Sequence, residues 1–411
     1  MHDWAVMWDW ATFAVRWLHV VAAIAWVGSS FYFIALDLGL RKIPGPSGGA
    51  HGEEWQVHGG GFYHVRKYAT APEGMPDHLT WFKWESYATW LSGAALLMIV
   101  YWAGGDLFLL DPNRANLTLW QAIPISAASI IVGWLLYDFM CRTGLGKRPA
   151  IMMLALFAVI VAMSWGLNQV FAGRAALLHL GAFAATIMTG NVFFVIIPNQ
   201  RVVVQDLREG RDPDPELGRA AKLRSTHNNY LALPVVLLML SNHHPLAFAG
   251  NHAWIIASLT FPIGVAIRHF FNTMHARKGH PFWTWAVAAV LFILIAWLSS
   301  SPLHGDVEEA GARDLAPAER KFVSAEGFDE VYAAVTGNCS MCHAREPVWD
   351  GLRWPPGGVV LETEADVARH ARQIFLQAGA SRAMPPPNAI STMEAESRAA
   401  IVAWYRDATR R

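Results

Sequence analysis

Apolar runs long enough to cross a lipid bilayer dominate this sequence. A spanning helix needs roughly 20 predominantly apolar residues. Eight runs are assigned as helices, at residues 12–36, 83–103, 119–140, 150–171, 176–197, 229–243, 252–272 and 283–300, of which the sixth is short and carries Pro234. Most lack the polar stripe of a soluble protein's surface helices. Because 54% of the chain is hydrophobic and only 16% is charged, we predict an integral membrane protein with a soluble appendage.

Lys and Arg in the connections predict the orientation, because basic loops stay in the cytoplasm. The connections after the first, third, fifth and seventh runs are basic, and the alternate ones hold few such residues. Eight crossings return the chain to its starting side, so both termini are expected in the periplasm of a bacterial inner membrane. Asp3 and Asp9, without any Lys or Arg in the first ten residues, argue against a cleaved signal peptide. The zero net charge gives no indication of nucleic-acid binding.

The expected fold is all-α, with three parts along the chain. Residues 1–300 form an eight-helix transmembrane bundle, residues 301–320 a polar linker with Gly and Pro, and residues 321–411 a small compact unit. Within that unit, Phe328–Val335 begins one helix and Glu394–Ala408 forms another. The predicted packing face of the second helix consists of Ile401, Val402, Trp404 and Tyr405.

The C-terminal unit contains Cys339-Ser-Met-Cys342-His343, the pattern by which c-type cytochromes attach haem. The two thiols bond the porphyrin, and the imidazole of His343 takes one axial position on iron. The third cysteine, Cys141, lies in an apolar run, so a four-ligand zinc site would lack partners. Such attachment occurs outside the cytoplasmic membrane, which agrees with the side assigned from the basic loops.

This unit resembles a class I cytochrome c, in which the first and last helices cross beside the haem. The resemblance implies a second axial ligand, usually Met, downstream of the attachment motif. Met384 lies in a loop bounded by prolines and is the expected ligand, with Met393 as the alternative. Either methionine could instead fill the core. The loop after Pro355 and Pro356 is expected to offer a backbone carbonyl to the His343 ring N–H.

Histidines within the apolar runs suggest a second haem or another metal, because ionisable groups inside a membrane are usually functional. His19 and His179 are the preferred pair for a b-type haem, with His243 as an alternative. A hydrogen-bonded structural role is the competing interpretation for each of them.

The first basic connection, residues 37–82, is expected to have little secondary structure. Three glycines follow His58 and would allow close backbone approach to a ligand. Its aromatic residues could stack on a planar ring or form an interfacial belt. They include Phe62, Tyr63, Trp81 and Trp84.

Four stretches together resemble the integral-membrane, cytochrome c-linked urate oxidase (urate hydroxylase) family. They are Val57–Tyr63, Leu79–Glu85, Asn191–Gln200 and Ser225–Leu231. Members of that family join an eight-helix domain to a C-terminal cytochrome c, and the order of parts matches here. The resemblance implies oxidation of urate to 5-hydroxyisourate, with electrons passed to the haem rather than directly to oxygen. It also implies a downstream respiratory acceptor, such as a soluble cytochrome c or a terminal oxidase.

Urate is a flat anion, so its site needs aromatic stacking, N–H donors, positive charge and a base. The candidates for acid–base chemistry are His58 and His227, with Glu85 to orient one of them or accept a proton. The candidates for substrate binding are Lys83, Asn199 and Arg268.

These candidates lie toward the cytoplasm, across the membrane from the haem motif. A second haem would bridge that gap; otherwise the substrate site lies in the outer half, near His243. Two other functions are considered. One is a quinol-oxidising electron-transfer protein without urate chemistry. The other is a non-enzymatic, membrane-anchored cytochrome, for which eight helices are more than an anchor needs.

Overall fold

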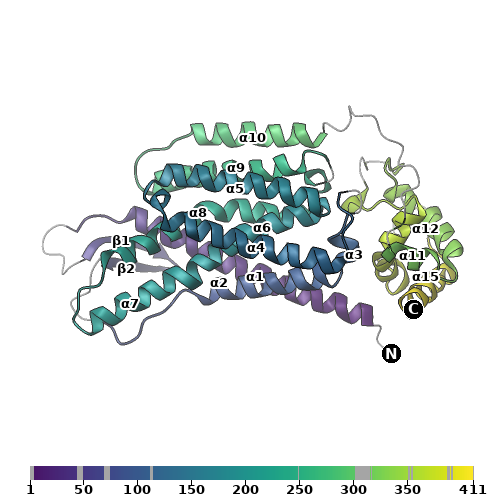
Figure 1. Ribbon diagram of the computed structural model, residues 1–411, viewed down its shortest axis with the longest axis horizontal. Coiled ribbons are helices and arrows are strands. Elements are labelled where there is room, and N and C mark those ends of the chain that lie inside the picture. Colours follow the sequence, from purple (N-terminus) through teal and green to yellow (C-terminus); the bar gives the residue numbers. More distant parts are fainter. Residues whose placement is uncertain are drawn as a thin grey trace.

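The computed structural model describes residues 4–43, 50–68, 75–111, 114–248, 250–300, 315, 317–349, 352, 355–386, 389 and 392–410. The described chain is mostly helical, with one β-hairpin (Figure 1). Most of the predicted linker lies outside the described residues.

The N-terminal part consists of long helices joined by short connections. They are α1 (Trp4–Gly39), α2 (Trp84–Leu96), α4 (Leu119–Arg142), α5 (Pro149–Val170), α6 (Gly173–Gly190), α7 (Ile197–Arg208), α8 (Pro215–Leu240), α9 (Ala253–His275) and α10 (Trp283–Ser300). A π-helical segment, Leu97–Trp102, continues α2 toward the short α3 (Gly105–Phe108), and a second one, Asn191–Ile196, joins α6 to α7 without a break.

Five of these helical segments are long and apolar enough to cross a membrane: α1, α4, α5, the continuous α6–α7 and α9. The other three expected runs coincide with α2, α8 and α10. Large apolar side chains on the outer helices face away from the protein, for example Ile24 of α1 and Phe292 of α10. Extensive apolar exposure of this kind is rare in soluble monomers, so the fold is compatible with a membrane protein.

Helix α6 lies at the centre of the bundle and packs against α4, α5 and α8 (Figure 1). Its Leu180, Phe183 and Ile187 are completely buried. Gly133 of α4 lies against the ring of Phe183, where a Cβ atom would come within 2.3 Å of the ring. The close packing of α4 on α6 therefore depends on this glycine.

Helix α8 begins earlier than the sixth apolar run predicts. It starts at Pro215, after Asp214 accepts a hydrogen bond from the Glu216 backbone N–H as the helix cap. Arg224 falls between the fifth and sixth apolar runs, in a connection expected to be basic, but it is a buried residue inside the helix. Charged and apolar residues share one continuous helix here, so hydropathy alone places its start too late.

The expectation of an unstructured 37–82 connection is wrong, because it contains a hairpin of β1 (Ala50–His58) and β2 (Gly61–Tyr68). Gly59 and Gly60 form the two-residue turn with positive φ angles of 60° and 82°, as hairpin turns of this length favour. Tyr32 of α1 donates a hydrogen bond to Gln56 Oε1 at 2.5 Å. The hairpin is thus fastened to the end of the bundle where α1 finishes.

The C-terminal helices are α11 (Pro317–Val323), α12 (Phe328–His343), α13 (Glu364–Arg369), α14 (Ala371–Ile374) and α15 (Ala395–Arg410). Both helices expected there are present. Trp404 of α15 is almost fully buried, packs on Phe322 and Phe328, and donates its indole N–H to the Phe322 carbonyl at 2.8 Å. In Figure 1 these helices lie at the end of the bundle opposite the hairpin. Arg372 lies 3.8 Å from Asp9 at the start of α1.

Candidate functional site

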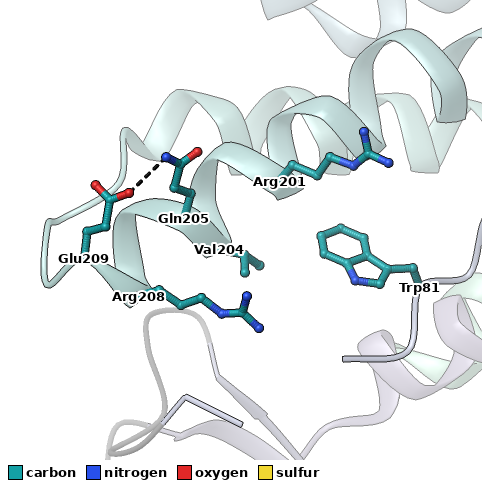
Figure 2. A pocket seen from close by; sticks show the side chains of 6 residues that line it. All are labelled: Trp81, Arg201, Val204, Gln205, Arg208 and Glu209. Atoms are coloured by element: carbon teal, nitrogen blue, oxygen red, sulfur yellow. Dashed lines mark hydrogen bonds between the residues drawn. The ribbon is translucent and has the colours of Figure 1, made fainter. Parts of the chain in front are cut away.

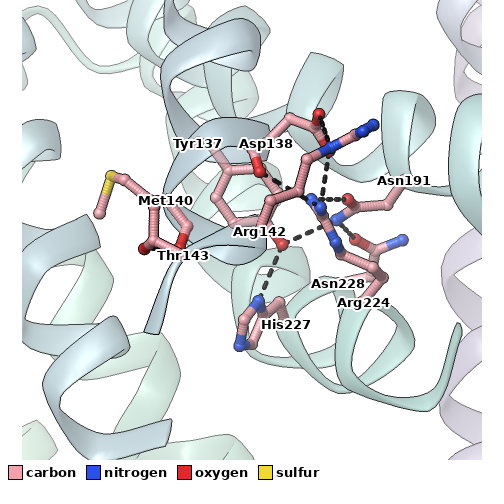
Figure 3. A network of polar contacts seen from close by, with 9 residues as sticks. All are labelled: Tyr137, Asp138, Met140, Arg142, Thr143, Asn191, Arg224, His227 and Asn228. Atoms are coloured by element: carbon pink, nitrogen blue, oxygen red, sulfur yellow. Dashed lines mark hydrogen bonds and ion pairs between the residues drawn. The ribbon is translucent and has the colours of Figure 1, made fainter. Parts of the chain in front are cut away.

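The interior of the bundle holds two separate polar clusters near its hairpin end. We call the first the Arg224 network and show it in Figure 3. It comprises Tyr137 and Asp138 of α4, Asn191 at the start of a π-helical segment, and Arg224, His227 and Asn228 of α8. Arg224 donates to Asp138 Oδ1 at 2.6 Å and to Asn191 Oδ1 at 3.0 Å. The charge of this arginine is therefore compensated inside the protein.

The remaining hydrogen bonds of the Arg224 network determine which ring nitrogen of His227 carries a proton. Asn191 donates from Nδ2 to the Tyr137 hydroxyl at 3.0 Å and to Asn228 Oδ1 at 2.9 Å. The Tyr137 hydroxyl, 2.8 Å from His227 Nδ1, is then free to donate its own proton to that nitrogen. A neutral His227 accepting at Nδ1 carries its proton on Nε2, and this buried atom has no partner in the structure.

The second group, the Arg268 cluster, lies between α1, β1, α8 and α9. Its members are Phe31, Glu54, Asn229, Arg268, Asn272 and His275. The Arg268 guanidinium lies 3.9 Å from the centre of the Phe31 ring. It donates to Asn272 Oδ1 at 3.0 Å and to Asn229 Oδ1 at 3.4 Å. Arg268 is only 4% exposed, and no described residue forms an ion pair with it.

Three buried polar atoms of the Arg268 cluster have no hydrogen-bond partner among the described residues. They are Asn229 Nδ2, His275 Nδ1 and Glu54 Oε2. Arg268, Asn272 and His275 follow one another at the four- and three-residue spacing that places side chains on one face of a helix. His275 interacts electrostatically with both Arg268 and Glu54. Since buried polar groups are normally satisfied, these atoms indicate a place where a polar ligand or water belongs.

The Arg268 cluster has the chemistry needed to bind a small anion and remove a proton from it. A buried guanidinium without a carboxylate is costly unless an anion joins it. Asn229 offers an amide donor, and the imidazole of His275 can accept a proton. Glu54 projects from β1 and lies against Gly39, where a Cβ atom would come within 2.5 Å of Glu54 Oε2. The hairpin therefore covers the cluster from the end of the bundle.

The structure does not bring the predicted catalytic residues together. His58 is the last residue of β1 and is exposed beside the Gly59–Gly60 turn, whereas His227 is buried in the Arg224 network. Glu85 lies in the first turn of α2. No described contact links His58 or Glu85 to His227.

The predicted substrate-binding residues are likewise spread over several elements. Asn199 donates to the Leu217 carbonyl at 3.2 Å and so ties α7 to α8. The Lys83 ammonium lies 5.6 Å from the Trp84 ring. Neither Asn199 nor Lys83 belongs to the cluster around Arg268.

The predicted pair of haem-ligating histidines is also not brought together. His19 Nδ1 contacts the Thr89 carbonyl at 3.0 Å and Ser92 Oγ at 3.1 Å, whereas the His179 ring packs on Tyr101. Ser92 and Tyr101 are nine positions apart, about 13 Å along their helix.

His179 has protein partners on both ring nitrogens: Ser126 Oγ and the Ala175 carbonyl, each at 2.7 Å. These bonds agree with the hydrogen-bonded structural role that was the competing interpretation for this histidine. His243 is exposed in the short turn after α8. In the described ranges, no three His, Cys, Asp or Glu side chains are grouped as metal ligands would be.

The Cys339–His343 motif forms the last turns of α12. Cys339 and Cys342 are unpaired thiols, and burial raises the pKa of Cys339 to about 11, so this thiol is neutral at pH 7. His343 Nδ1 lies 2.9 Å from the Val359 carbonyl. A backbone carbonyl of the loop after Pro356 therefore orients the His343 ring through Nδ1, as expected. The other ring nitrogen, Nε2, stays available to bind a metal.

The two candidate methionines differ in their surroundings. Met384 is 36% exposed, and Arg398 donates to its backbone carbonyl at 2.9 Å. Met393 is 6% exposed and belongs to the hydrophobic core of the C-terminal unit. The position of Met393 agrees with core filling, and Met384 is the more exposed of the two methionines.

Several residues of the two clusters are absent from the sequence-based candidates: Tyr137, Asp138, Asn191, Arg224, Asn272, His275 and Glu54. Asp138 and Asn191 carried a usable signal, since each is a polar residue inside an apolar run. Glu54 carried none, because only the hairpin register turns it toward the bundle.

These features define a class of protein: a mostly helical chain, compatible with a membrane protein, that holds a buried cationic cluster beside a β-hairpin. A sequence model of the urate oxidase N-terminal family matches residues 5–299, and the chain belongs to that family. Membership indicates an enzyme related to urate oxidation. No match was found among curated proteins or among solved structures.

Proposed function

We propose that this protein is a membrane-bound urate oxidase that binds urate at the Arg268 cluster and passes electrons to a haem c held by its C-terminal unit. The observation that carries the proposal is Arg268 itself. Its buried guanidinium has two amide oxygens and an aromatic ring as partners but no carboxylate. Urate is an anion near neutral pH and supplies the missing negative charge. The family match supports urate as the substrate.

Each side chain of the cluster has a distinct role in this proposal. Arg268 pairs with the charged edge of urate, and Asn229 Nδ2 donates to a ring oxygen or nitrogen. His275 Nδ1 accepts the proton released from urate or from the attacking water. Glu54 stabilises the resulting imidazolium. This assignment replaces His58 and His227 as the base, because neither lies in the Arg268 cluster.

The reaction balances as urate plus water giving 5-hydroxyisourate, two protons and two electrons. A bond forms between C5 of urate and the oxygen of water, one O–H bond of water and one N–H bond of urate break, and the C4–C5 double bond of urate becomes a C4–N double bond.

The C-terminal unit offers a residue set that fits a covalently attached haem. Cys339 and Cys342 would bond it, and His343 would bind its iron through Nε2 while Nδ1 stays on the Val359 carbonyl. Met384 would supply a second protein ligand to the iron. When bound, such a group accepts electrons one at a time, and His–Met ligation raises its reduction potential.

Electrons must travel from one end of the bundle toward the other in this proposal. Arg268 is 15 positions after Ala253, which opens α9 at the opposite end (268 − 253 = 15), or about 22 Å along the helix. Under the orientation derived from the basic connections, the hairpin end faces the cytoplasm and the C-terminal unit lies in the periplasm of a bacterial inner membrane.

An anaerobic absorption spectrum of the oxidised, detergent-purified protein before and after urate addition tests this function. Appearance of the reduced c-type α-band is the expected result. Reduction by a quinol but not by urate would overturn the proposal and favour a quinol-oxidising electron-transfer protein.

A further inference from the structure

A second cationic site lies outside the bundle interior, where α7 runs past the hairpin. A cleft of about 280 Å³ is lined by Trp81, Arg201, Val204, Gln205, Arg208 and Glu209 (Figure 2). All but Trp81 belong to α7 or the residue that follows it. The volume lies just below the roughly 300 Å³ at which pockets for drug-sized ligands begin, so the cleft suits one small ring compound.

The two arginines of the cleft have no carboxylate partner in the described chain. Arg208 donates from Nη2 to the Asp77 carbonyl at 3.2 Å, a neutral acceptor that holds the guanidinium at the cleft without neutralising it. Arg201 makes no hydrogen bond to a described residue. The two residues are seven positions apart, so they lie on the same face of α7, about 10 Å apart along its axis.

The carboxylates nearest in sequence are already engaged elsewhere. Arg211 pairs with Asp206, with Nε 3.0 Å from Oδ1, and also with Glu209. Gln205 donates a further hydrogen bond to Glu209 Oε1 at 2.9 Å. The positive charges of Arg201 and Arg208 therefore remain available to a ligand.

Trp81 supplies a flat apolar surface between these charges. Figure 2 shows its indole extending toward α7, with Arg201 and Arg208 on either side of it. The other aromatic residues of this region are far more open, with exposed fractions of 77% for Phe62, 67% for Trp84 and 54% for Tyr63. An indole face combined with two guanidinium groups selects a planar, anionic ring.

We propose that this cleft captures the urate anion at the hairpin end of the bundle before the urate reaches the Arg268 cluster. The inference rests on the function proposed above and adds a second, non-catalytic binding site for the same substrate. A cleft open to the cytoplasmic side would raise the local concentration of an anion beside the bundle.

Equilibrium dialysis with radiolabelled urate tests the capture site. The full-length protein is first reduced with dithionite, so that bound urate is not oxidised. We expect two urate molecules per chain in the wild type and one in the Trp81→Leu and Arg201→Gln variants. We also expect Trp81→Leu to raise KM for urate about tenfold, as the loss of a stacking contact predicts.

The control variant is Arg219→Gln, which removes an exposed arginine of α8 that pairs with Glu216 outside the cleft. It should bind two urate molecules. The same number of bound urate molecules in the wild type and in both cleft variants would overturn the capture site.

Two further experiments distinguish this inference from its alternatives. Arg268→Gln should keep one bound urate, held in the cleft, while losing urate-dependent haem reduction. If that variant turns over normally, the proposed catalytic site fails although the cleft still stands. Inorganic phosphate or phosphatidylglycerol vesicles that displace the cleft urate from the wild type as readily as unlabelled urate does would identify a general anion site and overturn purine selectivity.

Discussion

At the scale of single residues, the buried arginines Arg224 and Arg268 are expected to contribute differently to the stability of the fold. Arg224 and Asp138 form an ion pair whose side chains are 5% and 11% exposed. Arg268 is equally buried but has only neutral partners. Removing one member of a buried ion pair leaves the other charge without its partner and destabilises the fold. Removing a buried charge that has no partner leaves no other charge uncompensated.

We therefore expect Arg224→Met to destabilise the protein by less than the roughly 3–5 kcal/mol that breaking a buried ion pair usually costs, because Arg142 stays 2.7 Å from Asp138 Oδ2. Arg268→Met should leave thermal stability unchanged or raise it, while abolishing urate-dependent haem reduction. Thermal unfolding in detergent and the anaerobic spectrum measure the two effects. Equal loss of stability in both variants would contradict the assignment of Arg268 as a ligand-binding charge.

A pH effect is expected from His370 in the C-terminal unit. Burial lowers the pKa of His370 below its ordinary value of 6.5, although its bond to the Asp366 carbonyl works in the opposite direction. The unfolded chain then binds a proton more readily than the folded one. Stability from this group is complete above pH 6.5 and falls at lower pH, by up to about 1.4 kcal/mol per pH unit.

Hydrogen–deuterium exchange of the α12 and α15 peptides between pH 7.5 and about 5, corrected for the intrinsic exchange rate, measures this loss. His370→Gln keeps a hydrogen-bond donor but cannot titrate. Its corrected protection should therefore change less with pH than that of the wild type. Identical profiles would exclude His370 as the cause.

At the scale of elements, the Arg268 cluster depends on how closely α8 and α9 pack. Gly264 of α9 lies against Pro234 of α8, where a Cβ atom would come within 2.3 Å of the proline ring. Neither group is a flexible side-chain end, so one helix must move to admit a methyl group. Such a shift would separate Asn229 from Arg268, whose atoms are already 3.4 Å apart.

Gly264→Ala should consequently cost about 1–3 kcal/mol of stability, as overpacking does, and should raise KM for urate. Gly166→Ala in α5 is the matched control, because nothing lies within 4 Å of the added Cβ. The control should be neutral or stabilising by up to about 1 kcal/mol. Unfolding temperatures and urate kinetics of both variants check this, and an unaffected Gly264→Ala would contradict the close packing.

At the scale of the whole molecule, urate is a two-electron donor and the chain has one haem attachment motif. One urate should therefore reduce the haems of two protein molecules. An anaerobic titration should reach its end point at about half an equivalent of urate per haem, because two electrons leave each urate. An end point at one equivalent would indicate another electron acceptor in the chain or in the preparation.

The sequence by itself determined the helical architecture of this protein, since uninterrupted apolar runs leave a chain few other folds in which backbone groups are satisfied. It also located Cys339–His343 at the end of a helix, because that motif is local. The pairing of Glu53–His58 with Gly61–Arg66 was missed, although Gly59 and Gly60 between two stretches of residues are a hairpin signal.

Only the tertiary structure decided which polar residues meet. Arg224 and Arg268 look alike in the sequence, and the difference between them is Asp138, a partner 86 positions from Arg224. His275 and Glu54 join Arg268 because α9 and the hairpin converge at one end of the bundle. Such long-range contacts depend on helix packing and strand register, which no local pattern encodes.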